Sequence, residues 1–279
     1  MKKLEEYTAK DIQEMDYNQL IGLVRETNRV PGGLNSIIKI SQCSFLNSQS
    51  RILEIGTSTG ITAIEMAKLI GCKINAIDIN QASINEAKKR AKNEGVESLI
   101  NFEIQDATMT TFQDDYFDMV FCGNVTSLIS NRNKALIEYI RVLKKGGLVA
   151  AIPMYYIKPP SSELLSRVSN AIKVKIVDWD KAFWINFFSQ DTLSLIWHEN
   201  YKFNYIDDGT VKNFCTDILN RDHLTSLSQD AFKALTLKYR ECMMLFRDNL
   251  SHMGYTLMLL RKENSIIEPE LFTSSIITN

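Results

Sequence analysis

The sequence has few of the residues that mark a disulfide-bonded, zinc-binding or membrane protein. Its five cysteines are scattered and never spaced as CxxC, which favours reduced thiols over disulfides or a zinc site. It has no run of 18 apolar residues, and no apolar segment follows the first lysines. Neither a transmembrane helix nor a secretory signal is therefore expected. We predict a cytoplasmic protein that does not bind membranes.

An excess of charge of either sign is also missing. Lys and Arg number 32 against 33 Asp and Glu, which gives a formal net charge of -1. Such a balance provides no strong electrostatic attraction for nucleic acid or anionic lipid. With 279 residues the chain is nevertheless long enough to bury a sizeable core.

The sequence does contain a regular alternation of strand and helix patterns. Between residues 51 and 153 these patterns predict strands at 51–56, 73–79, 99–105, 117–122 and 147–153, and helices at 60–70, 81–94 and 131–144. This order is typical of a parallel sheet with helices on both faces. After Pro153 we predict an aromatic-rich insertion, a helix at 190–199, a strand at 201–206, a long helix at 228–250 and a strand at 255–260.

These elements predict one α/β domain with additions. The predicted parts are an N-terminal helical cap at 1–34, a Rossmann-like core at 35–154, an insertion at 155–200, a segment with the last two strands at 201–262, and a tail at 263–279. Ligands of such a fold bind beyond the carboxyl ends of the strands.

The most informative stretch is RILEIGTSTGITAIEMAK, from Arg51 to Lys68. It joins a predicted strand to a helix through the Gly56 to Gly60 turn, where a ligand can approach the backbone closely. Glu54, just before the turn, would repel a diphosphate but suits a ligand with an ammonium or sulfonium group. Ser58 stands where the dinucleotide fingerprint GxGxxG requires its middle glycine, which weakens a nicotinamide dehydrogenase interpretation.

This stretch resembles the first motif of class I S-adenosylmethionine-dependent methyltransferases, E/D-x-G-x-G-x-G. It matches at Glu54, Gly56 and Gly60 and departs at Ser58. Two further acids follow in the family's order. One ends the second predicted strand, where the family binds the ribose hydroxyls, and the other ends the third, where an acid commonly receives the adenine amino group. These acids are Asp78 and Asp106.

The resemblance covers roughly residues 35–153 and the last strands. It implies a doubly wound, seven-stranded, mostly parallel sheet whose last strand is antiparallel, with S-adenosyl-L-methionine as cofactor. The implied cofactor-binding residues are Glu54, Gly56, Thr57, Ser58, Gly60, Asp78, Ile79, Asp106, Ala107 and Asn124.

Within the family, EIGTSTGITA is most similar to small-molecule O-methyltransferases related to the catechol and caffeoyl-coenzyme A enzymes. Those enzymes place a metal-binding Asp directly after the fourth strand. Cys122, Gly123 and Asn124 stand there in this chain, so the metal mechanism does not carry over and no metal site is predicted. None of the three histidines lies at the carboxyl end of a predicted strand, so the catalytic residue is unknown.

We expect the acceptor pocket above the carboxyl end of the sheet. Candidate acceptor-binding residues are Arg29, which belongs to a polar group with Arg25, Glu26 and Asn28, and three aromatic residues after the fifth strand, Tyr155, Tyr156 and Trp184. Two simpler interpretations stay open at this point. The aromatic residues would only pack the insertion onto the core, and the polar group would only form a solvated helix end.

The sequence therefore predicts a methyltransferase that acts on oxygen or nitrogen of a small metabolite, natural product or short peptide, as a monomer or homodimer. One alternative is an RNA or protein methyltransferase, although the near-neutral charge and the lack of an aromatic-basic strip disfavour RNA. Another is a non-catalytic module of the same fold that binds a nucleotide or a partner.

Overall fold

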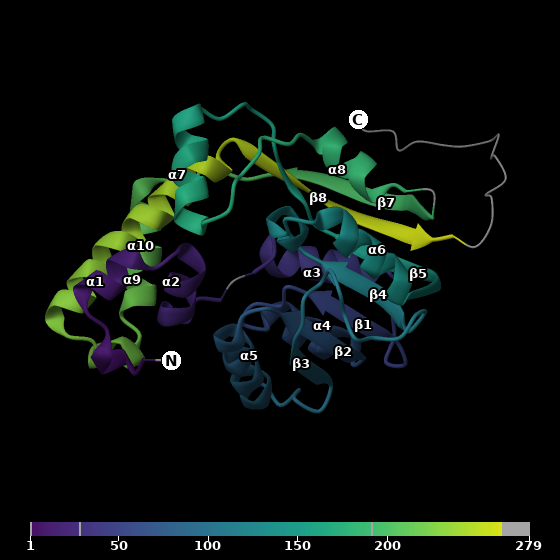
Figure 1. The fold of residues 1–279 in the computed structure, drawn as a ribbon, viewed down its shortest axis with the longest axis horizontal. Coiled ribbons are helices and arrows are strands. Elements are labelled where there is room, and N and C mark those ends of the chain that lie inside the picture. The colour runs from purple at the N-terminus through teal and green to yellow at the C-terminus, as the bar shows by residue number, and fades with distance from the viewer. Residues whose placement is uncertain (1, 28, 191, 264–279) are drawn as a thin grey trace.

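The structure is a computed structural model that describes residues 2–27, 29–190 and 192–263. Asn28 and residues 264–279, most of the predicted tail, lie outside this range. An α/β unit and a separate group of helices make up the described chain (Figure 1). The strands are β1 (Arg51–Ile55), β2 (Lys73–Asp78), β3 (Ile100–Ile104), β4 (Phe117–Cys122), β5 (Leu143–Ala151), β6 (Met154–Tyr156), β7 (Leu193–Lys202) and β8 (Met253–Lys262).

The strands form one sheet in the order β3-β2-β1-β4-β5-β8, with β6 and β7 also paired to β8. The pairs among β1 to β5 are parallel, whereas β8 runs antiparallel to β5, β6 and β7. β6 keeps the register that β5 has along β8, since Leu148 pairs with Arg261 and Met154 with Tyr255. The two therefore occupy one position, which reconciles eight strands with the predicted seven and confirms the mostly parallel sheet.

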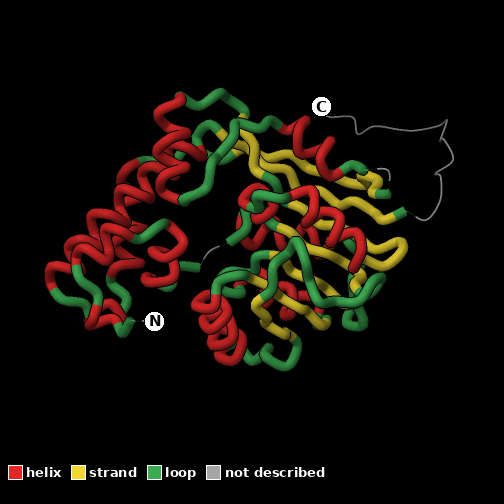
Figure 2. Tube along the Cα trace, viewed as in Figure 1, coloured by secondary structure: helices red, strands yellow, loops and turns green. Residues whose placement is uncertain are grey.

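Helices cover both faces of this sheet (Figure 2). One face packs against α3 (Gly33–Cys43), α4 (Ile61–Ile70) and α5 (Gln81–Asn93) through residues such as Ile37, Ile64 and Ile84. The other packs against α6 (Arg132–Val142) and α8 (Lys181–Phe188) through Tyr139 and Trp184. Strands that are buried on both faces account for the nearly continuous apolar runs in the sequence.

A third apolar core lies in the helical unit, which we define as α1 (Ala9–Glu14), α2 (Tyr17–Val24), α9 (Asp208–Leu219) and α10 (Gln229–Leu250). Leu20 and Val24 of α2 pack there with Cys215 of α9 and Leu235 of α10. The N-terminal cap is therefore completed by helices almost 200 residues later in the chain. α7 (Ser162–Ile172) contacts both α10 and α2. No helix of the described ranges is long and apolar enough to cross a membrane.

The predicted helix at 190–199 is wrong, because Leu193–Lys202 forms β7. Its residues alternate between more and less exposed positions, as expected for a strand with one face on the core. β7 pairs with β8 along nearly its whole length, and this long-range partner decides its conformation. The predicted strand at 201–206 is correspondingly wrong beyond Lys202, because residues 203–207 form no strand.

Candidate functional site

A cavity of about 880 Å³ lies at the carboxyl edge of the sheet. Parallel strands end together at this edge, and the strand order reverses between β1 and β4, which is where α/β sheets bind ligands. We call the part formed by the turn after β1 and the ends of β2, β3 and β4 the polar half. The part formed by α2, α7, residues 173–179 and α10 is the apolar half.

The turn after β1 has an unusual backbone. Gly56, Ser58 and Gly60 have φ angles of 68°, 49° and 84°, all in the left-handed region. A Cβ on Gly56 would lie 2.4 Å from the Val125 side chain, and one on Gly60 would lie 2.6 Å from Cβ of Ala87. Both positions therefore need glycine for its conformation and for its small size. Ser58 adopts the same region at a cost of about 1–2 kcal/mol.

Glu54 lies buried beneath this turn, and its carboxylate accepts a hydrogen bond from Thr57 Oγ1 at 2.6 Å. Burial raises the pKa of Glu54 to about 7, and nearby Asp78 raises it further, although hydrogen bonds from Thr57 and Thr62 oppose the shift. A bound cation would favour the ionised carboxylate and lower this pKa. The site thus suits an ammonium group.

Asp78 ends β2 with both carboxylate oxygens already oriented. One accepts the backbone N–H of Ser58 at 2.9 Å and the other that of Asn80 at 2.9 Å. Each oxygen keeps a lone pair for a further donor, so the carboxylate can accept two neighbouring hydroxyl groups. Burial raises the pKa of Asp78. Asp106 accepts the backbone N–H of Thr108 at 2.8 Å through Oδ1 and also lines the cavity.

Asn124 follows β4, and its amide orientation is fixed by the backbone. Its Oδ1 accepts the N–H of Met154 at 3.0 Å. Because this bond occupies Oδ1, the NH₂ group is the freer end of the side chain for a ligand. Ile79 is 77% exposed and, like Ala107, lines the cavity.

Nine of the ten predicted cofactor-binding residues line the polar half: Glu54, Gly56, Thr57, Ser58, Asp78, Ile79, Asp106, Ala107 and Asn124. The tenth, Gly60, is the last residue of the turn and the N-cap of α4, and it does not line the cavity. The structure therefore brings together side chains from four separate strand ends.

The apolar half contains residues that the sequence analysis missed. Its wall is mainly aliphatic and includes Ile21, Val168, Ile172, Val174, Ile176, Val177, Trp179, Phe246, Leu250 and Met253. They come from α2, α7, the segment that follows α7, α10 and the start of β8, which are far apart in the chain. The sequence does show that α7 and α10 each have an apolar face. An apolar face alone does not indicate which part of the protein it packs against or whether it lines a cavity.

Of the predicted acceptor residues, Arg29 and Tyr156 line the cavity. Tyr155 and Trp184 do not line it and instead lie in the core beneath the sheet, 7% and 1% exposed. The Tyr156 hydroxyl donates to Oδ1 of Asn249 at 2.7 Å, which places one buried polar pair within the apolar half.

The aromatic insertion forms a packed cluster rather than a pocket wall. Trp179 stacks on Phe183 at 4.8 Å, and the ring of Trp184 meets that of Phe183 edge-on at 5.1 Å. The guanidinium of Arg132 covers the Trp179 ring at 4.2 Å. Only Trp179 of this cluster reaches the cavity, so the interpretation in which the insertion packs onto the core holds for the others.

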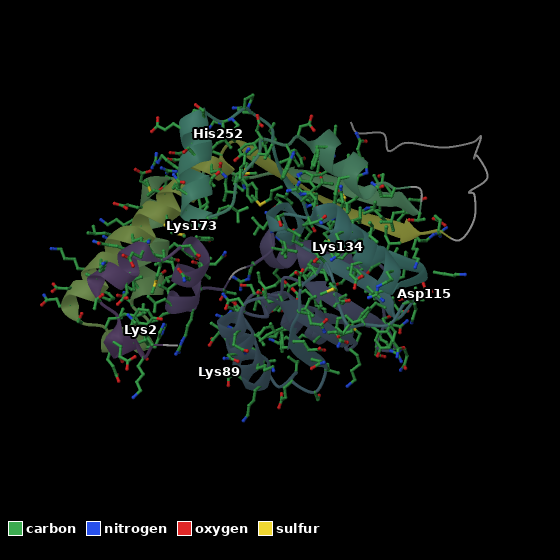
Figure 3. All side chains as sticks on the ribbon, in the orientation of Figure 1. Lys2, Lys89, Asp115, Lys134, Lys173 and His252 are labelled. Carbon is green, nitrogen blue, oxygen red and sulfur yellow. The ribbon has the colours of Figure 1, made fainter. Side chains whose placement is uncertain are left out.

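Ionisable groups are unevenly distributed around the cavity. Within the described residues, its carboxylates, Glu54, Asp78 and Asp106, all lie in the polar half, and no histidine lines it. Charged side chains such as Lys89 and Asp115 project outward from the α/β unit (Figure 3). The described ranges also contain no group of three or more His, Cys, Asp or Glu residues placed to hold a metal ion.

Comparison with known proteins identifies a domain in this part of the chain. A profile for the methyltransferase domain matches residues 53–151. The ubiquinone/menaquinone biosynthesis C-methyltransferase UbiE of Vibrio parahaemolyticus is 27% identical over 144 residues, which cover 50% of this chain and 54% of that protein. The chain thus spans about half the length of that relative.

Solved structures agree over most of the chain. The crystal structure of MccD protein has a TM-score of 0.72 and 26% identity, covering 85% of this chain and 100% of that chain. Haemonchus contortus phosphoethanolamine N-methyltransferase 2, solved with phosphomonomethylethanolamine and S-adenosylhomocysteine, has a TM-score of 0.67 and 16% identity, covering 93% and 59%. Residues 53–151 therefore form a methyltransferase domain with the fold of class I S-adenosylmethionine-dependent enzymes, which supports S-adenosylmethionine as the cofactor.

Proposed function

We propose that this protein transfers the methyl group of S-adenosylmethionine to oxygen or nitrogen of a small, largely apolar acceptor. The observation that carries the proposal is the continuity of the polar and apolar halves in one cavity of about 880 Å³. That volume lies near the upper end of the range for single-ligand pockets, roughly 300–1,000 Å³. It leaves room for a second small molecule beside the donor.

The proposed donor position follows from the chemistry of the polar half. The ribose diol binds the oriented carboxylate of Asp78, the adenine amino group lies near Asp106, and the amino group of the methionine part lies near Glu54. This arrangement puts the sulfonium near Asn124, where the polar half meets the apolar half. The methyl group then points toward the acceptor.

The walls of the apolar half favour an acceptor with a hydrocarbon body. Many of its contacts are aliphatic, and its polar groups include Asn18 and the Tyr17 hydroxyl of α2, Arg29, and the hydrogen-bonded Tyr156 and Asn249. Among the classes we considered, a small natural product fits better than a short peptide.

The chemistry requires little from the side chains of the apolar half. The described part of that half contains neither a carboxylate nor a histidine, so the acceptor supplies a nucleophile that is already ionised or has a free lone pair. Holding donor and acceptor in line supplies roughly 7–11 kcal/mol of the barrier reduction. A carbon nucleophile is a second candidate, favoured by the aliphatic wall and by the similarity to a protein named as a C-methyltransferase.

The proposal is tested by incubating the protein with deuterated-methyl S-adenosylmethionine and a fractionated cell extract, followed by mass spectrometry. We expect a labelled small molecule with wild type and much less of it with Asp78→Asn, which keeps the size of the side chain but loses its charge. Tandem spectra then assign the methyl to oxygen, nitrogen or carbon. Label found only in RNA or protein would support the other acceptor classes and contradict our proposal.

A further inference from the structure

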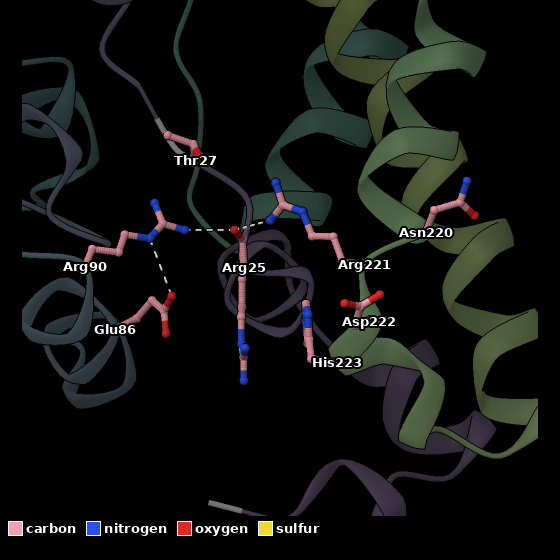
Figure 4. Close-up of a pocket in the computed structure, with 8 residues that line it drawn as sticks. All are labelled: Arg25, Thr27, Glu86, Arg90, Asn220, Arg221, Asp222 and His223. Atoms are coloured by element: carbon pink, nitrogen blue, oxygen red, sulfur yellow. Dashed lines mark hydrogen bonds and ion pairs between the residues drawn. The ribbon is translucent and has the colours of Figure 1, made fainter. Parts of the chain in front are cut away.

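A second hollow lies where the helical unit meets the α/β unit (Figure 4). Two guanidinium groups approach the backbone carbonyl of Arg25 there. Arg90 of α5 donates to it from Nη2 at 2.8 Å, and Arg221, which follows α9, donates to it from Nη1. One carbonyl is therefore held from both units at once. We call these three groups the clasp.

The end of α2 explains why two cations can meet here. α2 ends at Val24, and its C-cap residue Arg25 has a φ of 53° and a ψ of 38°, which turn the chain out of the helix. The last carbonyls of a helix have no partner within it and form the negative end of its dipole. Arg221 Nη1 also donates to the carbonyl of Val24 at 2.9 Å, and His223 Nε2 lies 3.0 Å from that of Leu23.

Arg90 also reaches the turn that lines the polar half. Its Nη1 donates to Oγ1 of Thr59 at 3.1 Å, and its Nε lies 3.4 Å from the Glu86 carboxylate. Thr59 lines the cavity and is 1% exposed. Ala87, one helical turn before Arg90, packs directly against Gly60 of the same turn. The face of α5 that supports the turn thus also carries the arginine of the clasp.

The chain that Arg90 holds continues over the cavity. Residues 25–27 and 29–32 join α2 to α3, and we call them the strap. Arg29 and Val30 of the strap line the cavity. The Val30 side chain packs so closely on Gly123 that an added Cβ there would lie 2.8 Å away. The strap therefore crosses the sheet edge beside Asn124, where the two halves of the cavity meet.

We propose that Arg90 is a positioning residue that couples occupancy of the turn after β1 to closure of the strap over the cavity. A ligand that orders the turn fixes Thr59, and Thr59 fixes the guanidinium that holds the end of α2. Because Arg221 holds the same carbonyl, the helical unit and its part of the acceptor wall follow the strap. Binding of a ligand in the polar half therefore closes the strap and the helical unit over the apolar half.

Hydrogen exchange with S-adenosylhomocysteine as the ligand tests this coupling without knowledge of the acceptor. In wild type we expect the ligand to slow exchange of the strap amides by about tenfold, the effect of one hydrogen bond from a charged donor. In Arg90→Ala the ligand should still bind, but most of the slowing should be lost. Arg90→Lys should also lose most of it, because an ammonium can reach the Arg25 carbonyl but does not hold Thr59 at the same time.

Two control variants separate coupling from general loss of structure or charge. Arg25→Gln removes a charge at the same place but keeps the carbonyl, since the Arg25 side chain points away from both partner guanidiniums (Figure 4); it should behave as wild type. Arg221→Ala should keep the protection of the strap by ligand but speed exchange in α9. Strap protection that survives in Arg90→Ala, or that is equally lost in Arg25→Gln, would overturn the inference.

The readout also separates this inference from the proposed function. It requires only that S-adenosylhomocysteine binds, whereas the proposed function requires a methylated product. If an acceptor is found, Arg90→Ala should lower kcat and raise the acceptor KM more than it weakens donor binding. An equal loss in all three would contradict a positioning role.

Discussion

Glu54→Gln is expected to change how stability depends on pH. Burial raises the pKa of Glu54 from its ordinary value of 4.5 to about 7 in the folded protein. The folded state therefore binds this proton more tightly than the unfolded state. The free energy of unfolding must fall as pH rises from about 4.5 to about 7 and stay lower above that. A difference of about 2.5 pKa units corresponds to roughly 3 kcal/mol.

Urea unfolding of the ligand-free protein at pH 5 and pH 8 measures this effect. Wild type should lose about 2.5 kcal/mol more than Glu54→Gln between these two values, because glutamine cannot ionise and keeps a similar shape. The comparison cancels contributions from other titrating groups, which both proteins share. Equal pH dependence in the two proteins would refute the burial argument for Glu54.

The same variant tests the role of Glu54 toward the donor. An ammonium group binds the ionised carboxylate, so the affinity of wild type for S-adenosylhomocysteine should fall about tenfold per pH unit below about pH 7. Calorimetry should show weaker binding by Glu54→Gln and a nearly flat profile in this range. A wild-type profile that is equally flat would mean that Glu54 does not pair with the ligand.

Three further substitutions follow from the cavity geometry. Gly60→Ala forces a Cβ to within 2.6 Å of Ala87 at a φ of 84° and should lower the free energy of unfolding by about 2–4 kcal/mol in urea titrations; wild-type stability would contradict the close packing. Asp78→Asn should weaken S-adenosylhomocysteine binding at least about tenfold by calorimetry, and unchanged affinity would remove Asp78 from the site. Phe246→Ala should raise the acceptor KM while donor affinity stays the same, whereas Leu237→Ala, at an exposed position of the same helix, should change neither; equal effects would contradict the proposed acceptor wall.

The polar half could be predicted from the sequence because its parts are local. Glu54, the glycine turn and Asp78 belong to one strand-turn-helix-strand unit, in which hydrophobic periodicity and turn residues determine the geometry. The parallel sheet then brings Asp106 and Asn124 to the same edge. The departure at Ser58 is accommodated, since it adopts the left-handed backbone of the glycine it replaces.

The apolar half could not be predicted because tertiary packing builds it. Ile21, Val168 and Phe246 meet only after α2, α7 and α10 have come together, and an apolar stripe does not specify its partner. The same limit explains Trp184, whose place in the core depends on α8 docking onto the sheet. It also explains β7, whose strand conformation depends on β8.

The central claim is that one cavity holds both S-adenosylmethionine and an apolar acceptor. The most direct measurement is the transfer of labelled methyl groups from the donor into solvent-extractable small molecules of a cell extract. We predict label in that fraction with wild type and clearly less with Phe246→Ala and with Asp78→Asn. Wild-type label confined to protein or RNA, or no transfer at all, would contradict the account.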